Sequence, residues 1–375
     1  MTKYLNRNAL CVKPLSERVN KLVYSRDLVC PHSYPVELTP EAQEDVEKTA
    51  EEICRAKERN AARILAFGAH SIKNGLGPVL SQLMQGHWLT HFATNGAGVI
   101  HDWEFAFQGQ SGEDVHRYTT EGQFGIWQET GTYINLAIIS GAFRGLGYGQ
   151  SIGMMIDLEG IEIPTDEELR ERIAAGCQTN ASEDSLETAS AAADFLKMKK
   201  HFSLSDGFLS IPHHKKENSA AYAAWRDGIP YTCHPMIGHD IIYTHPMNKC
   251  SAIGRAAELD FLSYADSVSQ LEGGVYLSVG SAVMSPMIFE KSLSMARNLS
   301  QQEEKKLTDF SIHVVDLAKS AWDWTKEGEP PMDNPAYYLR FCKTFSRMES
   351  RKMTYCSADN RSWLVALLKI LQKRA

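Results

Sequence analysis

Short apolar runs alternate with helical patterns along much of the chain, and several of the runs end in glycine or other small residues. The predicted strands cover 62–68, 88–94, 231–233 and 274–279, and the predicted helices cover 76–85, 99–107 and 288–298. Because a parallel strand pair needs a crossover that is usually helical, this order predicts a parallel sheet covered on both faces. The predicted fold class is α/β, a doubly wound, mostly parallel sheet with helices on both faces, Rossmann-like.

The same pattern predicts one domain over residues 1–375. Residues 1–39 are rich in proline, arginine and asparagine and show no sustained period, which indicates an arm over the core or over a partner subunit. Thr39 and Pro40 offer a helix cap and a first-turn proline for a helix over 40–60. Residues 165–200 are polar with helical spacing and predict a helical insert or lid.

Composition narrows the function classes. The 375 residues have a formal net charge of -7, with the basic residues dispersed, so a nucleic-acid partner is not expected. No uninterrupted apolar stretch of about 18 residues exists and the amino terminus lacks a signal-peptide pattern, so we expect a soluble, cytoplasmic protein without a membrane partner. The eight cysteines are scattered without a CxxC pair, which predicts free thiols and no metal site.

Three predicted strands end in small-residue turns, where ligands of open parallel sheets bind. The turns are Gly68-Ala69-His70-Ser71, Thr94-Asn95-Gly96-Ala97-Gly98 and Gly280-Ser281-Ala282. Their small residues let a ligand approach the backbone, and the amides opening each following helix favour an anion such as a pyrophosphate. None is a full GxGxxG, so the pattern leaves a nucleotide site and ordinary turn chemistry both open.

A polar cluster follows the strand at 231–233. It contains His234, His239, Asp240 and His245. An aspartate can hold a cationic amine and a histidine can exchange a proton near neutral pH, and His101-Asp102 could join them. The alternatives are histidines that cap turns and satisfy buried carbonyls, or a zinc site built from His234, His239 and Asp240.

One weaker candidate lies elsewhere. Residues 145–150, Gly-Leu-Gly-Tyr-Gly-Gln, look like a phosphate loop, but the Lys-Ser/Thr of a P-loop does not follow. No Gly-x-Ser-x-Gly elbow is present.

These segments resemble the deoxyhypusine synthase family, especially its bacterial deoxyhypusine synthase-like branch. The matching stretches, in family order, are 68–76, 90–102, 129–131, 234–242 and 273–298. The resemblance implies an NAD-binding fold, usually a homotetramer. It also implies chemistry in which spermidine is oxidised and its aminobutyl group passes through a lysine imine to an acceptor amine, either a small polyamine or a translation-factor lysine.

Carried over position by position, the resemblance implies specific site residues. His101 would act as acid/base, and Asp240 with its neighbour His239 would bind the polyamine. The NAD pocket would be lined by His70, Ser71, Asn95, Gly96, Ala97, Gly280, Ser281, Ala282 and Asp359.

The sequence departs from the family at its lysine motif. The Ser-Trp-Gly-Lys segment that supplies the imine-forming lysine is absent, and Lys352, beside Arg351, lies in roughly the right region. A lysine nucleophile needs a desolvated site, so a solvated lysine stays open as an alternative. The prediction is therefore an NAD-dependent aminobutyl transferase with Lys352 as catalytic candidate. Two alternatives remain, a non-catalytic NAD-binding member and modification of a protein acceptor.

Overall fold

Six parallel strands form the central sheet of the protein, which is described here from a computed structural model covering residues 3–374, apart from the side chains of Thr325 and Arg340. In spatial order the strands are β10 (Lys352–Ser357), β9 (Ser311–Asp316), β8 (Val275–Val279), β2 (Arg63–Phe67), β3 (His91–Thr94) and β7 (Tyr231–Cys233). Each neighbouring pair is parallel, so the predicted α/β class is confirmed.

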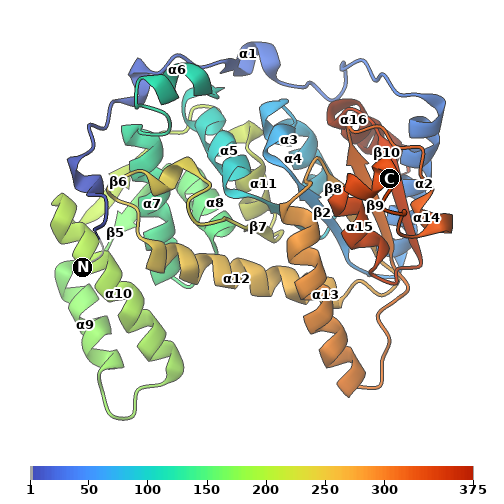
Figure 1. Ribbon diagram of the computed structural model, residues 1–375. Helices are drawn as coiled ribbons and strands as arrows, with labels where there is room; N and C mark the ends of the chain where they lie inside the picture. Colours follow the sequence, from blue (N-terminus) through green and yellow to red (C-terminus); the bar gives the residue numbers. More distant parts are fainter. Residues whose placement is uncertain (1–2, 375) are drawn as a thin grey trace.

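Alternate residues of the strands point to opposite faces, and each face packs on its own set of helices. On one face, Leu65, Phe67 and Leu277 belong to the core formed with α2 (Pro40–Glu58), α4 (Gly77–Gln85), α5 (Gly96–Gln108), α8 (Tyr148–Leu158), α11 (Ala220–Arg226) and α16 (Asn360–Gln372). On the other face, Ile64 and Tyr276 pack with α12 (Cys250–Ser269), α13 (Met284–Gln302) and α15 (Arg340–Ser346). Figure 1 shows the sheet between these two layers.

The helix predicted over 40–60 is α2, and its start follows the sequence signals. The Thr39 side chain accepts a hydrogen bond from the Ala42 amide, and Pro40 occupies the first turn. Its buried stripe runs through Ala42, Val46, Ala50 and Ile53, at helical spacing.

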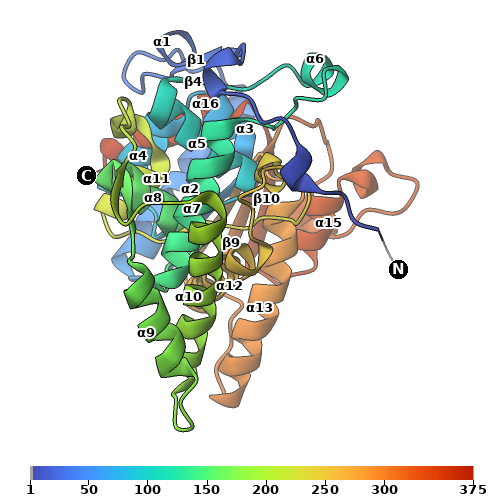
Figure 2. The same cartoon turned by 90° about the vertical axis from the view of Figure 1, so that its left-hand side faces the viewer.

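The region predicted as an insert folds as two long helices. They are α9 (Asp166–Gly176) and α10 (Glu183–Phe202), which pack against each other and project from the body in the same direction as the end of α13 (Figures 1 and 2). The two strands flanking this pair, β5 (Gly160–Ile163) and β6 (Gly207–Ser210), are antiparallel.

The amino-terminal arm crosses the edge of the molecule above the carboxyl ends of the strands (Figure 1). It carries η1 (Arg7–Ala9), η2 (Leu15–Glu17), β1 (Leu22–Val23) and α1 (Tyr24–Asp27). Strand β1 pairs with β4 (Gln110–Ser111), which follows α5. The arm is therefore fixed to the helix that leaves β3.

The remaining helices connect or flank these layers. They are α3 (Ala69–Lys73), α6 (Val115–Thr120), α7 (Gln128–Phe143), α14 (Trp324–Glu327), η3 (Lys216–Asn218), η4 (Ile241–Tyr243) and η5 (Pro335–Tyr338). Among residues 3–374, no helix combines the length and the apolar character needed to cross a bilayer.

The strand order locates a crevice. Strands β2, β3 and β7 follow one another toward one edge of the sheet. The next strand, β8, lies on the other side of β2, and β9 and β10 follow it toward the opposite edge. If the six strands are renumbered 1 to 6 in chain order, their spatial order is 3-2-1-4-5-6, which is that of dinucleotide-binding domains. In those domains the ligand lies beyond the carboxyl ends of the strands, at the point where the strand order reverses. In this protein the reversal lies between β2 and β8.

Candidate functional site

The carboxyl ends of β2 and β8 meet at two glycines. A β-carbon on Gly68 would overlap the carbonyl oxygen of Gly280, so only glycine allows this approach. Gly280 has a positive φ of 59°. Apart from the adjacent residues, a β-carbon on Gly280 would have one neighbour within 4 Å among the described residues, the Asn360 side-chain nitrogen at 3.8 Å. The two strand ends therefore leave open backbone at the switch point.

Side chains from α3 and α16 close one side of this crevice. Asn360 Nδ2 donates to Ser71 Oγ (3.4 Å), and Asn74 Nδ2 donates to Asn360 Oδ1 (2.8 Å). Asp359, predicted to meet the cofactor, accepts hydrogen bonds from the Arg361 and Ser362 amides and caps α16. Asn360 was missed by the sequence analysis, because nothing in its local pattern distinguishes it from an ordinary first-turn residue.

The other predicted cofactor residues lie at the same edge with different surroundings. His70 and Ala282 are exposed, whereas the Ser281 hydroxyl is buried and accepts the Ser285 amide (3.2 Å). The Asn95 side chain accepts the Gly98 amide (2.9 Å) and caps α5. The first turn of α5 thus already has an acceptor of its own.

A cavity of about 230 Å³ lies beyond the ends of β2, β3 and β7, under the arm. It is lined by Arg18, Lys73, Ala97, Ile100, His101, Glu104, Gly112, Glu113, Val115, Phe124, His239, Asp240 and Ile241. The structure therefore brings together three residues that the sequence analysis named as one candidate site, His101, His239 and Asp240. The local pattern did not reveal Arg18, Glu104 or Glu113, because they come from the arm, a helix interior and a loop.

His101 is held by a chain of hydrogen bonds that fixes its tautomer. Ser111 donates its hydroxyl proton to Glu104 Oε2 (2.6 Å), so it accepts from His101 Nδ1 (2.7 Å). The proton of neutral His101 therefore lies on Nδ1, and the lone pair of Nε2 remains available. Burial lowers the pKa of His101 to about 4, with a further lowering from Lys73, against the opposing charge of Glu104. His101 is thus a neutral proton acceptor at physiological pH.

Glu104 in turn is fixed by Arg18 of the arm. The guanidinium binds both carboxylate oxygens at 2.8 Å, and both side chains are 1% exposed. Thr130 donates a further hydrogen bond to Oε1 (3.0 Å). Burial raises the pKa of Glu104, but the charge of Arg18 and its hydrogen bonds outweigh this and lower the pKa below its usual value. The arm therefore completes the hydrogen-bond chain behind His101.

Asp240 lies against the backbone of α5. A β-carbon on Gly96 would overlap its carboxyl group, and its Oδ2 is buried without a hydrogen-bond partner among the described residues. Burial raises the pKa of Asp240 to about 6, against the smaller opposing effects of His239 and the Ala97 amide. A buried acceptor without a donor indicates a place for a hydrogen-bonding or cationic group of a ligand.

Lys352 lies at a different edge of the molecule. It begins β10, and its ammonium pairs with Glu52 of α2 (3.2 Å), which also meets His313 Nε2 (2.9 Å). Burial opposes the ionisation of Glu52, but its interaction with His313, a hydrogen bond from Ser311 and the charge of Lys352 hold its pKa below the usual range. Lys352 therefore stands at the amino end of its strand, whereas His101 and Asp240 lie beyond the carboxyl ends.

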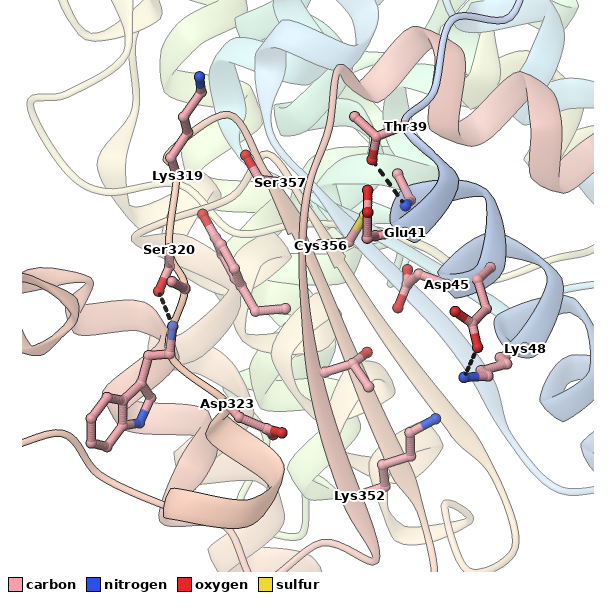
Figure 3. A pocket seen from close by; sticks show the side chains of 16 residues that line it. Thr39, Glu41, Asp45, Lys48, Lys319, Ser320, Asp323, Lys352, Cys356 and Ser357 are labelled. Carbon is pink, nitrogen blue, oxygen red and sulfur yellow. Dashed lines mark hydrogen bonds and ion pairs between the residues drawn. The ribbon is translucent and has the colours of Figure 1, made fainter.

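Lys352 also lines the largest cavity described, an open one of about 870 Å³ beside the edge strand β10 (Figure 3). Its walls come from the first half of α2 and from residues 319–323, with Lys48, Asp45, Lys319 and Asp323 around its rim. Sequence analysis did not predict this cavity because β9 and β10 were not recognised as strands.

We expect Lys352→Met to reduce the free energy of unfolding by about 1 kcal/mol, since Glu52 keeps His313 as a partner. Chemical denaturation would measure this. Lys319→Met, on the exposed opposite wall, should change stability much less. A variant of Lys352 as stable as the wild type would contradict the assigned ion pair.

The remaining residues of the polar cluster have structural partners. His234 Nε2 bonds Thr232 Oγ1 (2.9 Å) inside the sheet, and His245 Nδ1 accepts the Met247 amide (3.1 Å). Asp102 accepts Ser219 Oγ and the Ala220 and Ala221 amides, so it caps α11. No group of three histidine, cysteine or acidic residues within residues 3–374 could hold a metal ion.

The glycine-rich loop at 145–150 binds an internal anion. Asp260 of α12 accepts the Gly149 amide (3.0 Å) and the Cys233 amide (2.8 Å), and a β-carbon on Gly147 would overlap its carboxyl group. The loop therefore resembles an anion-binding site, but the Asp260 carboxyl group of the same chain already occupies it.

Comparison with known proteins finds distant structural similarity. No family model and no curated protein matches the sequence. The chain is similar to apo ArgZ, an arginine dihydrolase from the ornithine-ammonia cycle in cyanobacteria, at 16% identity and a TM-score of 0.43, over 89% of this chain and 33% of ArgZ. It is similar to AgrE in ternary complex with ornithine and NAD+, at 13% identity and a TM-score of 0.43, over 91% of this chain and 34% of AgrE.

A third similar structure is a conserved LOR/SDH protein from Methanococcus maripaludis S2, at 12% identity and a TM-score of 0.43, over 92% of this chain and 74% of that one. The chain thus spans about a third of the length of ArgZ and AgrE. NAD, the cofactor predicted from the sequence, is the one that the AgrE ternary complex contains.

The predicted membership of the deoxyhypusine synthase family is wrong. The similar structures are ArgZ, AgrE and a LOR/SDH protein, not deoxyhypusine synthases, and the predicted transfer of an aminobutyl group from spermidine is wrong with it. The physical reason lies in the matched segments. Most of them are strand ends and the helix starts that follow, where any doubly wound sheet needs small residues and caps. The lysine motif, which carries the transfer chemistry, was the part that did not match.

Proposed function

We propose that this protein is an NAD-dependent oxidoreductase whose substrate is a small molecule carrying an amine. The observation that supports it is the position of the His101 and Asp240 cavity beyond the strands that adjoin the switch point of a 3-2-1-4-5-6 sheet. In such a sheet a dinucleotide binds in the crevice, and its nicotinamide comes close to side chains that follow the neighbouring strands. A proton acceptor and an unpaired carboxylate occupy that neighbourhood here.

The residues present fit a dinucleotide. Open backbone at Gly280, exposed Ala282 and the buried hydroxyl of Ser71 provide space and polar groups at the crevice. When bound, NAD supplies a two-electron acceptor for the hydrogen leaving an amine-bearing carbon.

The chain's own groups would handle binding and protons. Asp240, ionised, would hold the amine against the first turn of α5. His101 Nε2 would take the proton released when a C–N bond is oxidised, and the resulting imidazolium would be stabilised by Glu104 through Ser111. The arm and the loop bearing Glu113 would exclude water above them.

Calorimetric titration with NAD+ tests this proposal. Wild-type protein should bind NAD+ with one saturable site, and Ala282→Asp should weaken binding at least about tenfold, because the new carboxylate would face the pyrophosphate. Ala193→Asp, on the exposed face of α10, is the matched control and should bind normally. The absence of NAD+ binding by the wild-type protein would overturn the proposal.

A further inference from the structure

Two charged groups lining the His101 cavity, Lys73 and Asp240, have no side-chain hydrogen bond or ion pair among residues 3–374. Lys73, at the end of α3, has no acidic partner among residues 3–374, and Asp240 has no basic side chain bonded to its carboxyl group. The other buried charges are satisfied. Arg18 is paired with Glu104, and Glu113 accepts the Trp127 indole (2.8 Å) and the Gly125 amide (3.1 Å). The cavity therefore presents one ammonium group and one carboxylate oxygen that no side chain of the described residues contacts by a hydrogen bond.

These two groups reach the cavity from segments that follow different strands. Lys73 follows β2 and Asp240 follows β7, while α5 leaves β3, which lies between those strands. After the larger effect of burial, the charge of Lys73 contributes to the lowered pKa of His101. A ligand bridging the cavity would thus meet the ammonium group of Lys73, the carboxyl group of Asp240 and the imidazole of His101.

From this arrangement we propose that the cavity binds a free amino acid as its zwitterion, with the carboxylate at Lys73 and the ammonium group at Asp240. The proposal rests on the proposed function, whose amine substrate it specifies. A zwitterion matches both charged groups at once, whereas a simple amine leaves Lys73 unpaired beside it.

The size and walls of the cavity agree with such a ligand. Its volume of about 230 Å³ equals that of roughly eight liquid water molecules, which suits a compact molecule of similar heavy-atom count. Ile100, Val115, Phe124 and Ile241 supply apolar surface between the charged groups. A short aliphatic chain would contact this surface, whereas a nucleotide or a peptide is too large.

Calorimetry with four related compounds tests the proposal without NAD+ present. 4-Aminobutyrate and 2-aminobutyrate carry both charges, butylamine lacks the carboxylate, and butyrate lacks the ammonium group. At least one zwitterion should bind wild-type protein about tenfold or more tightly than butylamine and butyrate, since each charge-assisted contact contributes about 1.5–3 kcal/mol in proteins, and a factor of ten corresponds to 1.4 kcal/mol. The α- or ω-position of the preferred amine then reports the distance between the two groups.

Variants of Lys73 and Asp240 test which charged group of the zwitterion each residue binds. Lys73→Met should reduce the affinity for the zwitterion to that for butylamine, and Asp240→Asn should reduce it to that for butyrate. Lys197→Met and Asp184→Asn, both on exposed parts of α10, are the matched controls and should bind like wild type. Equal binding of butylamine and both zwitterions by wild-type protein, or unchanged selectivity in Lys73→Met, would overturn the proposal. Because NAD+ binding is measured separately, these results are independent of the test of the cofactor.

Discussion

Replacing Arg18 by methionine should lower the free energy of unfolding by about 3–5 kcal/mol, because it leaves the Glu104 carboxylate buried without its cation. Both side chains are 1% exposed and the pair is bidentate, so water cannot replace the guanidinium without opening the arm. Urea denaturation of the full chain would measure the loss. Limited proteolysis would show whether residues 3–39 become accessible at the same time.

A second variant separates the charge from the packing. Arg18→Met combined with Glu104→Gln removes the unpaired charge and should recover part of the stability lost in Arg18→Met alone. If Arg18→Met costs less than about 1 kcal/mol and the arm stays protected, the buried pair does not anchor the arm as described.

Replacing His101 by phenylalanine should reduce turnover of the amino acid by about 10²–10⁴-fold, the contribution usual for a positioned general base. The phenyl ring has nearly the shape of the imidazole but cannot accept a proton. Steady-state NADH formation measures turnover, and calorimetry should show affinities for NAD+ and for the amino acid within a few-fold of wild type.

The pH profile gives an independent check on the same residue. Burial lowers the pKa of His101 to about 4, so the imidazole is neutral throughout the neutral pH range. Turnover at a saturating concentration of the amino acid should therefore be lost only as the pH falls toward 4. Asp240, whose pKa burial raises to about 6, must ionise to hold an ammonium group, so amino acid affinity should rise as the pH increases through 6. Wild-type turnover in His101→Phe would contradict the assigned role.

The fold was predictable from sequence where local signals agree. The apolar runs ending at Gly68 and Val279 and the Thr39-Pro40 cap predicted β2, β8 and α2 almost to the residue. Strands β9 and β10 were missed, since the apolar run of β9 follows a charged connector and β10 mixes polar with apolar residues on an edge. Without these strands the position of Lys352 at the amino end of a strand could not be predicted.

The site was predictable only where chemistry and strand ends coincide. His101 and Asp240 each follow a strand, and the rule that carboxyl ends share an edge brings them together. Arg18 acts through a contact between segments far apart in sequence, since 86 residues separate it from Glu104, so no local pattern marks it. The loop at 145–150 shows the converse, since its glycines serve the carboxylate of Asp260.

In the proposed function, a dinucleotide binds at the carboxyl ends of β2 and β8, beside Gly68 and Gly280, with its nicotinamide toward the His101 cavity. A crystal structure of the full chain with NAD+ bound tests it most directly. We expect the pyrophosphate to lie against the Gly280 turn and the nicotinamide to face His101 and Asp240. Density for NAD+ in the cavity beside β10, where Lys352 lies, would contradict it.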